Sequence, residues 1–119
     1  MEVEMQEVVL PERTQIKIDF SLTSEVNITD VSAQRKVSRL LLERVGNLLY
    51  GERPNLVFGR RLLWRVPIWL GLPSVGPVGQ LGSMDVDAQT GEILFTQQLL
   101  NTISDQGNEL ARRTLSSAT

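Results

Sequence analysis

Alternating apolar and polar residues predict strands in two parts of the chain. Between residues 15 and 22 every second residue is apolar, which is the period of a half-buried strand. Pro11 precedes this segment, so we expect residues 1–12 to form a separate edge strand or an arm. From 55 to 95 the pattern predicts a short strand at 56–58 and a turn at Gly59–Arg60. A long strand, a glycine-rich loop, a strand near 84–87 and a return strand at 93–95 follow.

The long strand carries two different faces. Its uniformly apolar face is expected to pack in the core, while the opposite face is mixed. Pro67 lacks the N–H that a ladder requires, which predicts an edge strand or a bulge. The core face holds Leu62, Trp64, Val66, Ile68, Leu70 and Leu72, and the mixed face holds Leu63, Arg65, Pro67, Trp69 and Gly71.

Two segments have the three- and four-residue apolar spacing of helices. The first begins at Thr29 or Asp30, either of which is a suitable N-cap, and is expected to end at a Gly51 cap before Pro54. The second begins near Thr96, and its Gly107 predicts a close approach to the sheet. We expect residues 116–119 to fray. The first stripe is Val37, Leu40, Leu41, Val45 and Leu48, and the second is Leu99, Leu100, Ile103, Gly107, Leu110 and Thr114.

These elements predict one α+β domain spanning 1–119. Strands joined by short turns pair antiparallel, so we expect an antiparallel sheet of four to five strands with two helices packed on one face. The expected order is β-α-β-β-β-β-α. A chain of 119 residues is long enough to bury a single core without disulfides or metals.

The composition excludes several kinds of site. The chain has no cysteine and no histidine, which removes Cys nucleophiles, thiolate or His-ligated metal sites and His acid–base catalysis. We therefore expect no enzyme activity, no catalytic residue and no cofactor. The longest apolar run is too short to span a membrane, and the acidic start differs from a signal peptide. A cytoplasmic protein without a membrane partner is expected.

Charge is unevenly distributed along the chain. Residues 35–65 contain eight basic and two acidic residues, whereas 1–34 contain seven acidic and two basic ones. This asymmetry indicates either two regions of one fold that attract each other or an anionic partner for the basic region. A nucleic-acid-binding regulator would use Arg35, Arg39, Arg60, Arg61 and Arg65, although the low overall pI of about 5.1 is unlike that class.

Two other motifs have ordinary structural interpretations. Asp85, Asp87 and Glu92 are a candidate divalent-cation site, but their spacing differs from an EF-hand and suits a solvated strand edge that leads into a turn. In that turn Gly91 is expected to have a positive φ. The glycines at every third position from Gly76 to Gly82 lack the following helix of a phosphate loop and predict a loop entering a bulged strand.

The mixed face of the long strand is the candidate contact surface. Leu63 and Trp69 on this face, with Arg60, Arg61 and Arg65 nearby, suit contact with a protein partner or a second copy of the chain. The alternative is cover by the chain's own N-terminal arm or second helix. The leading hypothesis is a non-catalytic protein-binding or regulatory module that forms a homodimer or binds one partner.

The string Val86-Asp87-Ala88-Gln89-Thr90-Gly91-Glu92-Ile93 resembles the closing hairpin of PepSY-type domains. The order of elements before it, from about residue 31, is also similar. The resemblance implies a small α+β fold and an association with the binding or inhibition of peptidases. The Trp64-Arg65-Val66-Pro67-Ile68 strand also resembles small uncharacterised bacterial proteins, some of them encoded beside PIN-type nucleases.

Overall fold

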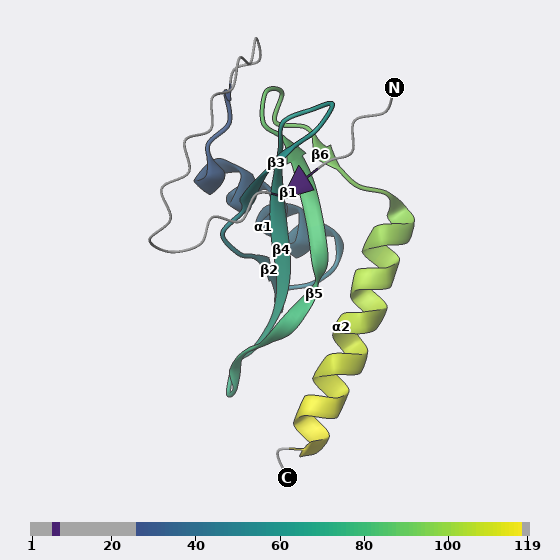
Figure 1. Ribbon diagram of the computed structural model, residues 1–119. Coiled ribbons are helices and arrows are strands. Elements are labelled where there is room, and N and C mark those ends of the chain that lie inside the picture. The colour runs from purple at the N-terminus through teal and green to yellow at the C-terminus, as the bar shows by residue number, and fades with distance from the viewer. Residues whose placement is uncertain (1–5, 8–25, 118–119) are drawn as a thin grey trace.

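The computed structural model describes residues 6–7 and 26–117, and these form two helices and an antiparallel sheet (Figure 1). The strand expected at 15–22 and the last two residues lie outside this range. Its strands are β1 (Gln6–Glu7), β2 (Leu49–Gly51), β3 (Asn55–Phe58), β4 (Leu63–Leu72), β5 (Gly76–Asp87) and β6 (Ile93–Leu94), and its helices are α1 (Asp30–Arg44) and α2 (Gln97–Ser117).

The sheet is built around β4. Its strand order is β1-β3-β4-β5-β6, and β2 pairs with β4 off this path. Every described pairing is antiparallel, as expected from the short connections. The predicted α+β class is confirmed, and β2 is a strand that the sequence pattern did not indicate. Neither helix in the described part of the chain is long and apolar enough to cross a membrane.

Both helices cover the same face of the sheet. Val66, Ile68 and Leu70 of β4 are buried in one cluster with Val37 and Leu41 of α1 and with Leu100 and Ile103 of α2. The alternation along β4 therefore sorted core from surface correctly over this stretch. Figure 1 shows α2 running alongside β5. The face opposite the helices is called the outer face below.

Pro67 lies in the central strand rather than at an edge, which corrects one of the two expectations. On one side of β4 the partner changes at Pro67, from β3 for residues 63–65 to β2 for residues 68–70. On the other side the register with β5 shifts between Pro67 and Trp69, as predicted for a bulge. The missing N–H therefore falls where the ladder is already interrupted.

The first helix ends earlier than expected. Thr29 is its N-cap, with Oγ1 accepting a hydrogen bond from the Ser32 N–H at 3.0 Å, but its last residue is Arg44. Gly51 is not a cap. It lies in β2, where its N–H donates to Ser38 Oγ at 2.9 Å. A Cβ at Gly51 would lie 2.8 Å from Val66 Cγ1, so glycine is required there for close packing of β2 beneath α1.

The segment 76–82 is part of β5 and not a loop. β4 and β5 form a long hairpin with a turn at residues 73–75. Gly82 has a φ of +124° and lies where β5 gains one residue relative to β4, which is the predicted bulge. This extra residue helps direct Leu81 to the helix-covered face, where it packs against the core.

The second helix packs on the sheet through its glycine, as predicted. A Cβ at Gly107 would lie 3.3 Å from Leu81 Cδ1 and 3.4 Å from Leu49 Cδ2, so the backbone of α2 approaches both side chains closely. Thr96 Oγ1 accepts a hydrogen bond from the Leu99 N–H at 3.1 Å at the start of the helix. The helix ends at Ser117, so its last two residues, 116 and 117, belong to the segment that was expected to fray.

Candidate functional site

The outer face of the sheet carries two aromatic residues on neighbouring strands. Tyr50 of β2 is directly opposite Trp69 of β4. A Cβ at Gly71 would lie 3.0 Å from Tyr50 Cε1, so the tyrosine ring lies against this glycine. We call Tyr50, Trp69, Glu52 and Pro77 the aromatic patch. Side chains directly opposite each other on neighbouring antiparallel strands are close enough for two aromatic rings to touch.

A shallow hollow lies at this patch. It has a volume of about 300 Å³ and is lined by Glu52, Arg53, Trp69 and Pro77. Its walls are therefore an indole ring, a proline ring and two side chains of opposite charge. Such a mixture of apolar surface and a few polar groups is typical of sites that orient a ligand.

The two tryptophans differ in their hydrogen bonds. Trp64 is half-buried on the helix-covered face, and its Nε1–H donates to the Ile28 carbonyl oxygen at 2.6 Å. The Nε1–H of Trp69 has no hydrogen-bond partner among residues 6–7 and 26–117. Buried side-chain polar atoms in that part of the chain are all satisfied, so the Trp69 donor is not fully buried. It is available to an acceptor on another molecule.

The Glu52 carboxylate of the patch affects the ionisation of Tyr50. Burial and, to a lesser extent, the nearby negative charge of Glu52 raise the pKa of Tyr50 above its ordinary value of 10.0. Glu52 forms no ion pair with any described residue, and its backbone N–H donates to the Pro67 carbonyl oxygen at 2.8 Å. The carboxylate therefore lies beside the aromatic rings without a cationic partner from the described chain.

The structure separates the five residues that the sequence placed on a contact surface. Trp69 lies on the outer face, half-buried. Leu63 also belongs to β4 but is only 2% exposed, so its side chain contributes to packing. Arg60 and Arg61 are exposed in the turn between β3 and β4. Arg65 is half-buried and engaged with Asp85, so the five do not form one continuous patch.

Both aspartates of the candidate cation site are bound to arginines. The Arg65 Nε and Nη2 donate to the two carboxylate oxygens of Asp85 at 3.0 and 3.2 Å, across the β4–β5 pair. Arg61 Nη1 lies 3.7 Å from Asp87 Oδ2. Among the residues that the structure describes, no three acidic, Cys or His side chains are grouped to hold a metal ion.

Asp87 closes the β5–β6 turn from a buried position, which corrects the expectation of a solvated edge. It is 6% exposed, and Oδ1 accepts hydrogen bonds from the N–H groups of Gln89 and Thr90 at 2.8 and 3.0 Å. Burial alone would raise its pKa, but these bonds and Arg61 outweigh that effect and lower the pKa. Gly91 has the predicted positive φ, +80°.

The basic stretch is partly neutralised within the fold. Besides Arg61 and Arg65, Arg39 lies 3.8 Å from Glu43 and Arg53 lies 4.0 Å from Asp30. Arg44 donates to Gln97 at 3.1 Å and lies over the Phe95 ring. Within the described range, only the Arg53–Asp30 ion pair joins the basic stretch to residues 1–34, most of which lie outside that range, so attraction between the two regions stays a prediction. The ion pairs of Arg39, Arg53, Arg61 and Arg65 reduce the positive field that a nucleic acid would meet.

The sequence missed Tyr50 because β2 has only three residues. A buried–intermediate–buried pattern of that length is indistinguishable from the end of a helix, and Gly51 fitted a helix cap. The available signal was Gly46, which follows the Val45 C-cap of the helix and whose N–H donates to the Leu41 carbonyl oxygen at 2.8 Å.

The chain matches no protein-family model, no curated protein and no solved structure. The resemblance of the 86–93 hairpin to PepSY-type domains stays a prediction.

Proposed function

We propose that this protein is a non-catalytic protein-binding module that holds an extended, proline-containing segment of a partner against its aromatic patch. The observation that supports this most directly is the Trp69 Nε1–H, which is not fully buried and has no partner in the described chain. The chain's lack of cysteine and histidine agrees with a role in binding.

The chemistry of the patch favours proline. A polyproline II segment has no internal hydrogen bonds, so its carbonyl oxygens are free to accept from a surface donor such as the indole N–H. Its rings pack against aromatic faces, and it loses little conformational entropy on binding. Tyr50 and Trp69 supply adjacent rings on one face, and Pro77 extends the apolar surface.

The charge of the patch adds a second requirement. Glu52 lies next to Tyr50 and has no cationic partner in the described chain. A lysine or arginine beside the proline of the ligand would meet this carboxylate. Contacts between exposed charges contribute about 0.2–1 kcal/mol, so the basic residue orients the segment more than it increases affinity.

The probe that tests this function is a fluorescein-labelled synthetic peptide of four prolines and one arginine, measured by fluorescence anisotropy. The patch is small, so we expect a dissociation constant of about 10–1000 µM. Trp69→Phe, which keeps a ring but removes the donor, should weaken binding about fivefold or more because one hydrogen bond contributes about 1 kcal/mol.

Two controls separate the patch from general charge attraction. Glu52→Gln should weaken binding of the arginine-containing peptide, whereas Glu92→Gln, at the exposed β5–β6 turn, should not. A peptide with alanine in place of proline should bind less tightly. Equal binding by wild type and Trp69→Phe, or tight binding of a single-stranded oligonucleotide that weakens steeply with salt while the peptide does not bind, would contradict the proposal.

A further inference from the structure

The first half of β5 has a neighbouring strand on one side only. β4 pairs with β5 along residues 76–87, whereas β6 pairs only with Asp85 and Val86. In the described part of the chain, residues 78–83 therefore form an edge of the sheet, and this edge runs beside α2 (Figure 1). The backbone groups on such an edge are able to pair with another extended chain.

Ser83 directs its backbone to this free edge. Asp87 donates its N–H to the Glu92 carbonyl oxygen at 2.8 Å, so the backbone of Asp87 faces β6. Every second residue of a strand directs its N–H and C=O to the same side, which places those of Asp85 and Ser83 on the side of β6 as well. The pairing with β6 ends at Asp85, and no backbone hydrogen bond outside the strand ladders joins Ser83 to another described residue.

Gln80 directs its backbone to the same edge. The Pro67 carbonyl oxygen and the Gly71 N–H both bond to the β2 side, so Trp69, midway between them, also faces β2. Gln80 is directly opposite Trp69. Opposite residues of an antiparallel pair face either toward or away from each other, so Gln80 faces away from β4. Its side-chain Nε2 donates to the Gly82 carbonyl oxygen at 3.2 Å, which is a contact within the strand rather than with a neighbour.

An open hollow lies between this edge and α2. It has a volume of about 490 Å³, within the range of about 300–1,000 Å³ that is typical of ligand sites. Its apolar surface includes Leu81 and Leu110, and its polar residues include Gln80, Asp105, Glu109 and Arg113. The residues from α2 recur at three- and four-residue spacing, so they lie on one face of the helix. A strand added beside β5 would direct every second side chain toward this hollow.

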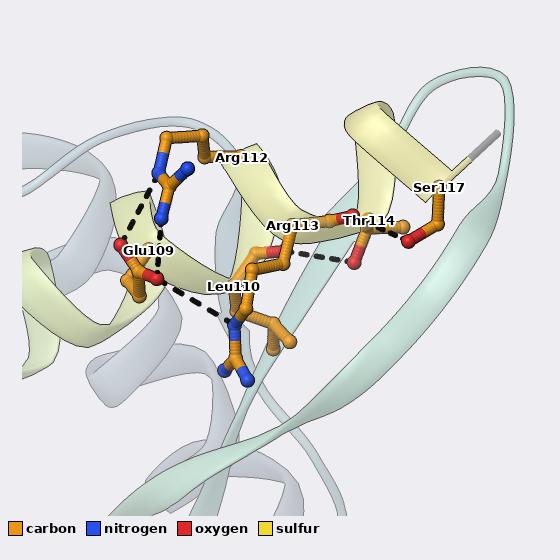
Figure 2. Close-up of polar contacts among 6 residues, drawn as sticks. All are labelled: Glu109, Leu110, Arg112, Arg113, Thr114 and Ser117. Atoms are coloured by element: carbon orange, nitrogen blue, oxygen red, sulfur yellow. Dashed lines mark hydrogen bonds and ion pairs between the residues drawn. The ribbon is translucent and has the colours of Figure 1, made fainter. Parts of the chain in front are cut away.

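The hollow offers a carboxylate that the described chain does not pair. Glu109 is engaged by two arginines, with Arg112 Nη2 at 2.7 Å and Arg113 Nε at 3.7 Å from its Oε1 (Figure 2). Asp105, one helical turn earlier, is exposed and has no ion pair within the described part of the chain. A basic residue of a ligand would therefore be attracted to Asp105, and an acidic residue would be repelled.

We propose that the free edge of β5 binds an extended peptide segment of a partner by strand addition, antiparallel to β5. Main-chain hydrogen bonds to Gln80 and Ser83 hold the segment, an apolar side chain packs against Leu81 and Leu110, and a lysine or arginine pairs with Asp105. The ladder needs N–H groups that proline lacks, so this ligand differs in chemistry from the proline-containing segment proposed for the aromatic patch.

The probe is a capped seven-residue peptide in which threonine alternates with valine, lysine and valine. In an extended strand its valines and lysine lie on one face, toward the hollow, and its threonines lie on the other. A single added strand makes few contacts, so we expect a dissociation constant of about 0.1–1 mM, measured by NMR titration of the 13.3 kDa protein. Prolines at the third and fifth positions should weaken binding at least about tenfold, because the residues on the threonine face are those that bond to Gln80 and Ser83.

Amide hydrogen exchange tests whether the peptide binds at the edge. The Gln80 and Ser83 amides should exchange rapidly in the free protein, and about tenfold more slowly when the peptide is present at about ten times its dissociation constant. The Met84 amide is the internal control. Met84 faces its partner Val66 on β4, so its amide should exchange slowly in both states.

Two substitutions test the contacts separately. Gln80→Pro removes an edge N–H that faces away from β4, and should weaken binding about fivefold or more. Asp105→Asn should weaken binding of the lysine peptide about two- to fivefold, but not binding of a peptide with threonine in place of lysine. Glu43→Gln, at an exposed carboxylate of α1, is the matched control and should leave binding unchanged. Circular dichroism checks the fold of Gln80→Pro, and Asp105→Asn with the peptide pair tests the proposal independently of that variant.

Three results would overturn strand addition. Slow exchange of Gln80 and Ser83 in the dilute free protein would mean that the edge is already paired, and a doubled mass in analytical ultracentrifugation would identify a second copy as its partner. Exchange that the peptide does not slow, or equal binding of the proline-containing peptide, would exclude the ladder. Trp69→Phe should leave this binding unchanged, so failure of the aromatic-patch site and failure of this one are separate results.

Discussion

The two faces of β4 carry one tryptophan each, and the two side chains differ in their hydrogen bonding. Trp64 lies on the helix-covered face and uses its indole N–H to bind the Ile28 carbonyl oxygen just before α1. Trp69 lies five residues later on the outer face, and its N–H has no partner in the described chain. An odd separation along a strand places two side chains on opposite faces.

This difference separates the packing of one face of the strand from the partly exposed groups of the other. The helix-covered face contains side chains that are fully buried, such as Val66 and Ile68. The outer face keeps partly exposed aromatic and charged groups whose hydrogen-bonding capacity is not all used within the fold. A polar group that is left without a partner costs little at the surface but about 1–3 kcal/mol when buried, so only the outer face can keep a free donor.

The largest expected difference concerns two adjacent residues on opposite faces. Ile68→Ala should lower the free energy of unfolding by about 3 kcal/mol, because Ile68 is fully buried and the cavity cannot be filled easily. Trp69→Phe should lower it by less than about 1 kcal/mol. Urea unfolding of both variants measures this contrast. Equal losses would mean that the outer face contributes to the core as much as the inner one.

An intermediate effect is expected at Asp87, which belongs by alternation to the outer face but is buried. Asp87→Ala should cost about 1–3 kcal/mol at neutral pH, because two backbone N–H groups lose their charged acceptor. Glu92→Ala in the same turn, with an exposed side chain, is the control and should change stability by less than about 0.5 kcal/mol.

The contribution of Asp87 also has a predictable pH dependence. Its pKa is lowered in the folded protein, so the stabilisation is complete above the unfolded value of about 4 and is lost as the pH falls through the lower folded value. Unfolding measured across acidic pH should therefore show wild type and Asp87→Ala converging. A constant difference down to the lowest pH would contradict the lowered pKa.

The smallest effect is a change in a single titration. Tyr50 is the only tyrosine, so the ultraviolet absorbance of phenolate reports it alone. Its midpoint should lie above 10.0, because burial and Glu52 both raise the pKa. Glu52→Gln should move the midpoint down but leave it above 10.0, since burial is the larger cause. A midpoint that does not respond to this change would separate Glu52 from the aromatic patch.

The elements that the sequence predicted well are those with long or chemically distinctive signals. The alternation along β4 identified the buried residues Val66, Ile68, Leu70 and Leu72, because one side of the sheet is covered along its length. The turn around Gly91 followed from backbone geometry that few residues other than glycine adopt. The close approach of α2 to the sheet at Gly107 was predicted correctly, because a glycine within an apolar helix stripe has few explanations other than close packing.

The elements that it predicted poorly depend on contacts between distant residues. Pro67 suggested an edge strand, but a proline is compatible with a central strand when two partner strands meet beside it. Gly51 fitted a helix cap, yet its real requirement is the proximity of Val66, fifteen positions away. Arg65 was predicted to lie on a contact surface, but its guanidinium pairs with Asp85 on the neighbouring strand.

By itself, the sequence determined the α+β class, the helices, the core face of β4 and the absence of cysteine and histidine chemistry. These depend on local periodicity and composition, which act on neighbouring residues. Only the tertiary structure decided that Tyr50 joins Trp69, that Leu63 is buried and that arginines neutralise Asp85 and Asp87. Strand pairing and ion pairs join residues far apart in the chain, and their energies depend on a register that local patterns do not specify.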